Sequence, residues 1–199
     1  MTINCMLAGV GGQGTVLASK LIAQSAMNRG LNARTAETIG MAQRGGCVVS
    51  HVRIGEEIHS PMIPLGEADV ILGFEPAEAV RCLPYLKPDG AVVVSQKAIR
   101  PVTASLGGHY DGDEMLDYLK QHVNHLILVD GEAICKQCGS AKVLNVALLG
   151  AACGAGLLGL LKEQLEETIH QRLPQRFVEL NTKALHAGIA AAQGGTRCV

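Results

Sequence analysis

Six residues near the N-terminus, GVGGQG at positions 9–14, have the composition of a phosphate-binding turn. The first, third and sixth are glycines in G-x-G-x-x-G spacing, between a predicted strand and a predicted helix. Glycine permits positive φ angles and lets a ligand approach the backbone. A helix N-terminus offers free N–H groups and partial positive charge to an anion. The pattern therefore predicts a diphosphate site formed by Gly9, Gly11, Gly12, Gln13 and Gly14. A closely packed turn without a ligand is the alternative.

Use of NAD or FAD at this turn would require an acidic residue about 20 residues further on, which binds a ribose hydroxyl. Glu37 occupies such a position, at the end of a predicted strand. The adjacent Gly11 and Gly12 and the polar Gln13 are unusual for a dinucleotide loop. The turn thus indicates an anion site more strongly than it indicates a particular dinucleotide.

A second candidate lies in the segment GMAQRGGCVVSHVRIG (40–55), where one cation stands in a glycine loop before a predicted strand. The planar fork of donors on an arginine matches carboxylates and phosphates. The neighbouring glycines allow the backbone to bend sharply, and a glutamine amide can both donate and accept. We therefore predict a second ligand-binding group, consisting of Gln43, Arg44, Gly45 and Gly46, with an ordinary solvated loop as the alternative.

Two further groups of residues could carry chemistry. Cys135 and Cys138 form a lone C-x-x-C pair, which is half of a zinc site or a redox pair. Because no second pair with suitable spacing exists, we interpret it as structural and expect no metal site. Glu75 and Glu78 follow a predicted strand, at the edge where open sheets bind ligands, although carboxylates also favour the first turn of a helix. We assign no catalytic residue to this chain.

The composition limits the class of protein. The 199 residues are 48% apolar and 18% charged, with a net charge of −1 and no block of basic residues, which argues against nucleic-acid binding. The seven cysteines, an odd number, are typical of a reducing compartment, and no signal peptide is apparent, so we expect a cytoplasmic location. The apolar stretch 143–161 contains an asparagine and four glycines, and we predict a buried helix there rather than a membrane span.

Short apolar runs alternate with helical patterns along the chain. Strands are predicted at 3–10, 33–39, 47–54, 69–74, 90–96 and 125–130, and helices at 15–29, from 75 to about 83, 143–161, 162–171 and 175–192. Such alternation favours an α/β fold: a Rossmann-like three-layer α/β/α arrangement with a mostly parallel sheet and a helical C-terminal third. We expect one domain over residues 1–192 and a flexible tail at 193–199.

Four motifs in this order resemble the gamma domain of the 2-oxoacid:ferredoxin oxidoreductases, especially the beta subunit of the indolepyruvate enzymes. They are GVGGQG (9–14), ETIGMAQRGGCVVSHVRIG (37–55), SPMIPLGEADVILGFEPAEAVR (60–81) and SAKVLNVALLGAA (140–152). Ile39 departs from the histidine that is expected before GMAQRGG.

The resemblance implies a subunit of an enzyme that oxidatively decarboxylates an aryl 2-oxoacid, passes the acyl group to coenzyme A and reduces ferredoxin. Thiamine diphosphate and [4Fe–4S] clusters would belong to a large partner subunit, and this chain contains no C-x-x-C-x-x-C run of its own. This chain would contribute to coenzyme A binding and would be inactive alone, and it could also form a homodimer. The alternatives are a free-standing NAD(P)- or FAD-binding oxidoreductase and a structural or regulatory subunit without a ligand.

Overall fold

The computed structural model describes residues 2–40, 46–100 and 110–194. Six strands form one sheet in the order β2-β3-β1-β4-β5-β6. Their bounds are β1 Ile3–Val10, β2 Asn32–Ile39, β3 Cys47–Gly55, β4 Ala68–Gly73, β5 Leu86–Ser95 and β6 His125–Val129. The pairs β1–β4, β4–β5 and β5–β6 are parallel, whereas β3 runs antiparallel to both of its neighbours.

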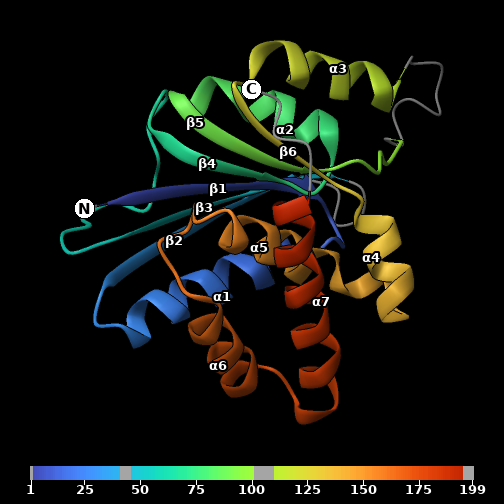
Figure 1. Cartoon of the computed structure of the whole chain (residues 1–199). Coiled ribbons are helices and arrows are strands. Elements are labelled where there is room, and N and C mark those ends of the chain that lie inside the picture. Colours follow the sequence, from blue (N-terminus) through green and yellow to red (C-terminus); the bar gives the residue numbers. More distant parts are fainter. Residues whose placement is uncertain (1, 41–45, 101–109, 195–199) are drawn as a thin grey trace.

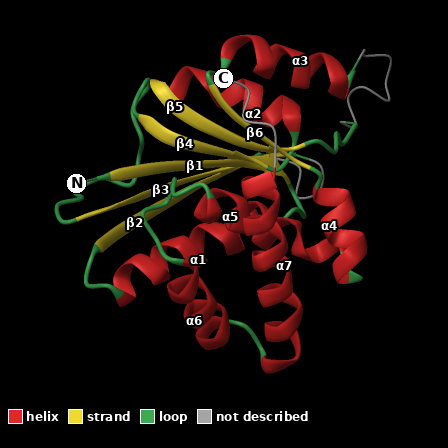
Figure 2. Cartoon of the chain, in the orientation of Figure 1, coloured by secondary structure: helices red, strands yellow, loops and turns green. Residues whose placement is uncertain are grey.

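Helices cover both faces of the sheet (Figures 1 and 2). On one face lie α2 (Pro76–Cys82) and α3 (Gly112–His122). On the other lie α1 (Thr15–Asn28) and α5 (Leu144–Gly154), with α4 (Gly131–Cys138), α6 (Lys162–Arg172) and α7 (Gln175–Gly194) packed around them. The predicted three-layer α/β/α fold with a mostly parallel sheet is confirmed.

Alternation along the buried strands divides the core in two. In β1, Cys5 and Leu7 belong to the apolar cluster under α1 and α5, whereas Met6 and Ala8 belong to the cluster under α2 and α3. All four side chains are fully buried. This two-sided burial is the reason why the strand appears in the sequence as a continuous apolar run.

Glycines bring α5 and α7 into close contact. A Cβ on Gly150 would lie 2.2 Å from the carbonyl oxygen of Leu185, and one on Gly188 would lie 1.9 Å from the carbonyl oxygen of Ala147. The small residues of the apolar stretch therefore serve a helix–helix contact within the chain.

The apolar stretch differs from its prediction in length. Instead of one helix over 143–161, α5 ends at Gly154, and the chain then turns at Gly156 and Gly159, which have φ angles of +75° and +59°. Helix α7 also continues through Gly194, into the segment that we expected to be a tail. None of the helices in the described ranges combines the length and apolar character needed to span a bilayer.

Candidate functional site

The glycine segment lies where the direction of chain winding changes. Strand β1 has β3 on one side and β4 on the other, α1 packs below the sheet and α2 above it. In open α/β sheets such a switch point, at the carboxyl ends of the strands, is the usual place for a ligand. The GVGGQG segment contains the last two residues of β1 and continues past the carboxyl end of this strand.

Two glycines of this turn have left-handed backbone angles. Gly12 has φ +102° and Gly14 has φ +82°, a region that costs other residues about 1–2 kcal/mol. A Cβ on Gly12 would meet nothing within 4 Å, whereas one on Gly14 would lie 2.6 Å from Nδ2 of Asn145. Gly12 therefore leaves open space beside the turn, and Gly14 allows α5 to pack against it.

Gln13 and Gly9 fix the position of the turn. The Gln13 side chain accepts from the N–H of Val10 (2.8 Å) and donates to the carbonyl of Phe74 (2.8 Å), and so links the ends of β1 and β4. A Cβ on Gly9 would lie 2.7 Å from Gln13 Oε1. These contacts give Gly9 and Gln13 a structural role in holding the turn.

The N-terminus of α1 has no cap of its own. Gly14 is the N-cap residue and has no side-chain oxygen, and the first turn of the helix contains no acidic residue. The free N–H groups and the positive end of the helix dipole are thus available to an anion.

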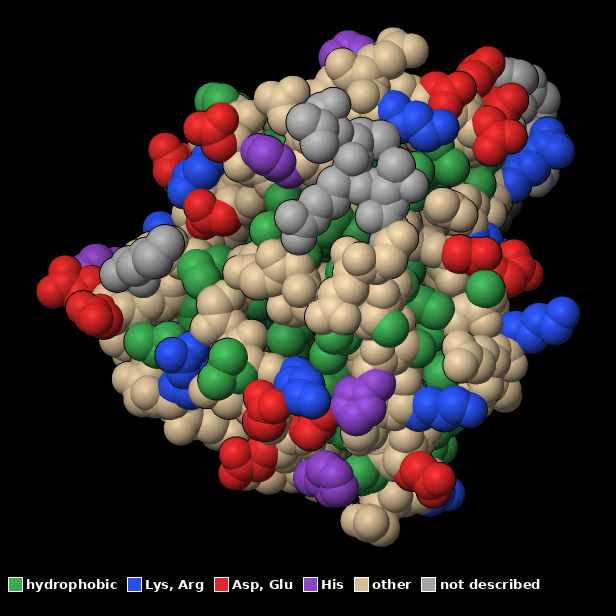
Figure 3. Space-filling model, in the orientation of Figure 1, with side chains coloured by type: hydrophobic (Ala, Val, Ile, Leu, Met, Phe, Trp, Pro, Cys, Tyr) green, Lys and Arg blue, Asp and Glu red, His purple; other side chains and the backbone are tan. Residues whose placement is uncertain are grey.

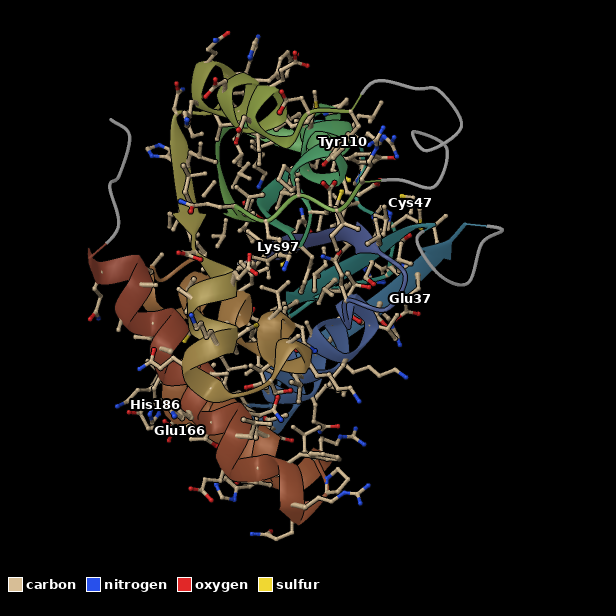
Figure 4. All side chains as sticks on the ribbon, turned by 90° about the vertical axis from the view of Figure 1, so that its right-hand side faces the viewer. Glu37, Cys47, Lys97, Tyr110, Glu166 and His186 are labelled. Carbon is tan, nitrogen blue, oxygen red and sulfur yellow. The ribbon has the colours of Figure 1, made fainter. Side chains whose placement is uncertain are left out.

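A pocket of about 810 Å³ opens beside this turn. Its walls come from residues 12–14, the segment after β5 including Lys97, helix α4, the connection from α4 to α5 including Lys142, and the start of α5 including Asn145. Its volume is within the range of small-molecule sites, about 300–1,000 Å³. A second pocket, of about 790 Å³, lies between α4, α6 and α7 near His170 and His186, away from the strand ends. Figure 4 shows Lys97 near the strand ends and His186 far from them.

The pocket is locally basic. Lys97, Lys136 and Lys142 line it, against one acidic residue, Glu132, which pairs with Lys97 at 3.0 Å. The chain as a whole has a net charge of −1, and acidic and basic side chains are interspersed over the face shown in Figure 3. An excess of lysines around one pocket favours an anionic ligand there.

The wall of the pocket also includes an unpaired buried acceptor. Asn145 is only 2% exposed; its Nδ2 donates to the carbonyl of Gly14 (3.2 Å), while its Oδ1 has no hydrogen-bond partner. An unsatisfied buried polar atom costs about 1–3 kcal/mol. This oxygen has almost no accessible surface, so the cost belongs to the packing of α5 against the glycine turn.

The second predicted group lies only in part within the described residues. Gln43, Arg44 and Gly45 are outside them. The carbonyl of Gly46 accepts from the N–H of Gly11 (2.8 Å), so this loop rejoins the sheet directly beside the glycine turn. The two glycine-containing segments, far apart in sequence, meet at one edge.

An acidic cluster lies on the α2 side of the same edge. Glu75 and Glu78 are 2% and 5% exposed. Glu75 caps α2 by accepting from the N–H of Glu78 (3.1 Å), and it also accepts from the N–H of Ile99 (3.3 Å) and from the hydroxyl of Tyr110. Burial and Glu75 raise the pKa of Tyr110. Figure 4 shows Tyr110 and Cys47 at this end of the molecule. The expected preference of both glutamates for the start of a helix is confirmed. Tyr110 also belongs to this cluster, and the sequence alone did not indicate it.

Glu37 does not reach the pocket. It lies on β2, which is separated from β1 by β3, and its carboxylate accepts from Ser19 Oγ (3.3 Å). Glu37 is not among the residues that line the pocket. In dinucleotide-binding folds the acidic strand lies beside β1, so this strand order disfavours the NAD geometry.

The C-x-x-C pair lies within α4 instead of at its beginning. Cys135 lines the pocket, and burial raises its pKa. Redox cysteines have lowered pKa values and lie at helix N-termini, so the geometry favours a structural interpretation. Within the described ranges, no cluster of three or more His, Cys, Asp or Glu side chains is arranged to hold a metal ion.

Comparison with protein families matches residues 4–191 to Pyruvate ferredoxin/flavodoxin oxidoreductase. The chain belongs to this family. An indolepyruvate oxidoreductase subunit IorB from Archaeoglobus fulgidus is 40% identical over 98% of this chain and 98% of its own length. The common gamma subunit of the pyruvate/ketoisovalerate oxidoreductases of Pyrococcus abyssi is 29% identical over 96% of this chain and 97% of its own length. The predicted family, and the assignment to the subunits of 2-oxoacid oxidoreductases, are confirmed.

Solved structures share the fold. The gamma subunit of a keto/oxoacid ferredoxin oxidoreductase from Geobacter sulfurreducens has a TM-score of 0.70 and 23% identity, and the match covers 96% of this chain and 98% of that one. A 2-oxoglutarate:ferredoxin oxidoreductase from Magnetococcus marinus, described with coenzyme A bound, has a TM-score of 0.74 and 21% identity. That match covers 98% of this chain and 32% of that one. The same fold thus occurs as a separate subunit and as one part of a longer chain.

Proposed function

We propose that this chain is the small subunit of an indolepyruvate-type 2-oxoacid:ferredoxin oxidoreductase. The overall reaction converts an aryl 2-oxoacid, coenzyme A and two oxidised ferredoxins into an aryl-acyl coenzyme A, CO₂, a proton and two reduced ferredoxins. The 40% identity to an indolepyruvate oxidoreductase subunit over nearly the whole chain supports this class of substrate.

The large partner subunit holds thiamine diphosphate and the iron–sulfur clusters in this proposal. Thiamine diphosphate supplies the carbanion chemistry of decarboxylation, and the clusters carry the electrons to ferredoxin. The described residues of this chain offer no metal-binding cluster for that purpose. The complex would operate in the cytoplasm, and a homodimer of this chain is not required for it.

The role of this chain in the proposal is to bind coenzyme A. The observation that supports it is the uncapped N-terminus of α1, which opens onto a pocket lined by three lysines. The diphosphate of coenzyme A would lie against the turn at Gly12 and Gly14, where backbone N–H groups and the helix dipole stabilise negative charge. Arg44 and Gln43 would close over the phosphate-bearing ligand or over the active site of the partner subunit.

A reconstitution experiment tests the proposal. The chain is purified together with its large subunit, and reduction of ferredoxin by indolepyruvate is measured with and without coenzyme A. Activity that requires both chains and coenzyme A is the expected result. A large subunit that is fully active alone would refute the proposal.

Titration of the complex with coenzyme A, NAD and FAD separates the alternatives. We expect binding of coenzyme A alone, because Glu37 lies two strands away from the turn. Binding of NAD or FAD in preference would favour the free-standing oxidoreductase, and absence of all binding would favour a structural or regulatory subunit.

A further inference from the structure

Two neighbouring residues at the end of β4 contact two different walls of the pocket beside the glycine turn. The carbonyl of Phe74 accepts from Nε2 of Gln13 (2.8 Å), which belongs to the wall formed by the turn. The carboxylate of Glu75 accepts from the N–H of Ile99 (3.3 Å), which belongs to the wall formed by the segment after β5. Phe74 and Glu75 thus connect the two walls from behind, although neither is among the residues that line the pocket.

The wall after β5 depends on side-chain contacts for its position. Residues 96–99 lie outside regular secondary structure. The N–H of Lys97 donates to Ser95 Oγ (3.2 Å). The N–H of Ile99, further along the segment, donates to Glu75 Oε1 (3.3 Å). Both acceptors are buried, with exposed fractions of 0% for Ser95 and 2% for Glu75. A hydrogen bond to a carboxylate is stronger than one between neutral groups, so Glu75 is well suited to hold this wall.

The two carboxylate oxygens of Glu75 have separate partners. Oε1 accepts from Ile99 and also from the hydroxyl of Tyr110, whereas Oε2 accepts from the N–H of Glu78 (3.1 Å) and caps α2. The segments that carry Ile99 and Tyr110 are in close contact, because a Cβ on Gly112 would lie 2.2 Å from Cβ of the residue before Ile99. Oε1 therefore joins two segments beside the pocket, and Oε2 serves the helix alone.

We propose that Glu75 is a positioning residue for coenzyme A. Through Oε1 it fixes the wall at Lys97 and Ile99 relative to the glycine turn, so that the pocket keeps its shape before the ligand arrives. The inference rests on the proposed function, which places coenzyme A in this pocket. A wall that is already ordered lowers the cost of binding. Loss of the Oε1 contacts should therefore weaken the binding of coenzyme A and leave the chemistry on the partner subunit unchanged.

Substitutions can separate the two oxygens. In Glu75→Gln the amide oxygen should occupy the Oε1 position, because two donors point there and only one points to Oε2. The amide NH₂ cannot accept from the N–H of Glu78, so this variant loses the helix cap and keeps the wall. Glu75→Ala loses both. Tyr110→Phe keeps the cap and removes one Oε1 contact, and it is mild enough to report on the wall if Glu75→Ala does not fold.

The test uses the complex of this chain with its large subunit. The rate of ferredoxin reduction by indolepyruvate is measured against the concentration of coenzyme A, and calorimetric titration with coenzyme A gives the affinity independently of turnover. Tyr118→Phe is the matched control for Tyr110→Phe, because Tyr118 is 43% exposed on α3 and is not among the residues that line the pocket.

We expect the KM for coenzyme A to increase about tenfold in Glu75→Ala and about threefold in Tyr110→Phe. It should change by less than about twofold in Glu75→Gln and in Tyr118→Phe, and the calorimetric affinities should follow the same order. The kcat at saturating coenzyme A should stay within about twofold of the wild type in all four variants. A merely structural role would give the reverse, a lower kcat at an unchanged KM, because only the fraction of folded complex would decrease.

Two failures are distinguishable. If Glu75→Ala keeps the wild-type KM, if Glu75→Gln raises the KM as much as Glu75→Ala does, or if Tyr110→Phe behaves as Tyr118→Phe does, the positioning role is overturned while coenzyme A binding stands. If the wild-type complex neither binds coenzyme A nor needs it for turnover, the proposed function itself is overturned, and the inference with it.

Discussion

Substitution of the two left-handed glycines by alanine should separate the binding role of the turn from its structural role. At Gly12, the cost is that of the backbone alone, because a Cβ would meet nothing within 4 Å. A left-handed alanine costs about 1–2 kcal/mol, and the reduced freedom of the unfolded chain returns about 0.4–1 kcal/mol. Gly12→Ala should therefore lower the free energy of unfolding by only about 1 kcal/mol.

At Gly14 a second cost is added. The new methyl group would lie 2.6 Å from Asn145 Nδ2, and displacement of this side chain would break its 3.2 Å hydrogen bond to the Gly14 carbonyl. A lost hydrogen bond costs about 1 kcal/mol. We expect Gly14→Ala to destabilise the chain by about 2 kcal/mol, and more if α5 has to move.

Gly12→Ala, which should cost little stability, should nevertheless weaken the binding of coenzyme A. In Gly12→Ala the methyl group enters the open space beside the turn, so the affinity for coenzyme A should decrease at least about tenfold, which is about 1.4 kcal/mol. Gly30→Ala is the control: Gly30 has φ +78° and open space around it, but it lies at the other end of α1. Urea unfolding gives the stabilities, and calorimetry on the complex gives the affinities.

Two results would refute this reasoning. If Gly12→Ala binds coenzyme A as tightly as Gly30→Ala does, the turn is not the diphosphate site. If Gly14→Ala costs no more stability than Gly12→Ala, the contact with Asn145 does not constrain the turn.

Three further substitutions or conditions test the packing and the titration of buried groups. Gly188→Ala should destabilise the chain by about 2 kcal/mol in urea unfolding, because its methyl group overlaps a backbone carbonyl of α5. Gly194→Ala, in the same helix, is the control and should not destabilise it. Equal stabilities of the two variants would contradict the close contact between α5 and α7. Glu75→Ala should cost about 2 kcal/mol, because a helix cap is lost and the partly buried Tyr110 hydroxyl and Ile99 N–H lose their acceptor. A change below about 0.5 kcal/mol would show that water replaces the carboxylate. The free energy of unfolding should be constant up to about pH 9 and decrease towards pH 11. Burial raises the pKa of Cys47 and of Cys153 from 9.0 to about 11, so the unfolded chain releases these protons at lower pH than the folded chain does. Urea unfolding at pH 7, 9 and 10.5 measures this, and a flat profile would contradict it.

The sequence predicted the strands well for a physical reason. The strands of the parallel part are buried on both faces and appear as uninterrupted apolar runs, such as residues 69–74, which the structure gives as β4 Ala68–Gly73. Helix α7 was similarly recognisable, because Pro174 separates it from α6. Helix α3, by contrast, was not assigned bounds, although its acidic first turn and basic last turn are a readable signal.

The glycine turn could be predicted from local sequence, whereas the rest of the pocket could not. Lys97, Lys136, Lys142 and Asn145 come from segments more than 80 residues away from Gly12 in the chain. Lys142 and Asn145 lie within the SAKVLNVALLGAA motif, but no local spacing indicates that they meet the glycine turn. The position of Glu37 relative to the turn likewise depends on the order of the strands in the sheet. Its distance along the sequence suited a ribose contact, but β3 is inserted between β2 and β1, an arrangement that local patterns do not reveal.

The helix termini at the carboxyl edge show why the anion site is at α1. Three other helices follow parallel strands here, and each begins with a carboxylate cap: Glu75 at α2, Asp111 at α3 and Asp130 at α4. These carboxylates occupy the free N–H groups and repel an incoming anion. Only α1, among the helices that follow strands in the described residues, begins with a glycine and lacks an acidic first turn. A phosphate that approaches this edge is thus excluded from three helix N-termini and attracted to the fourth, on the side where the lysines of the pocket lie.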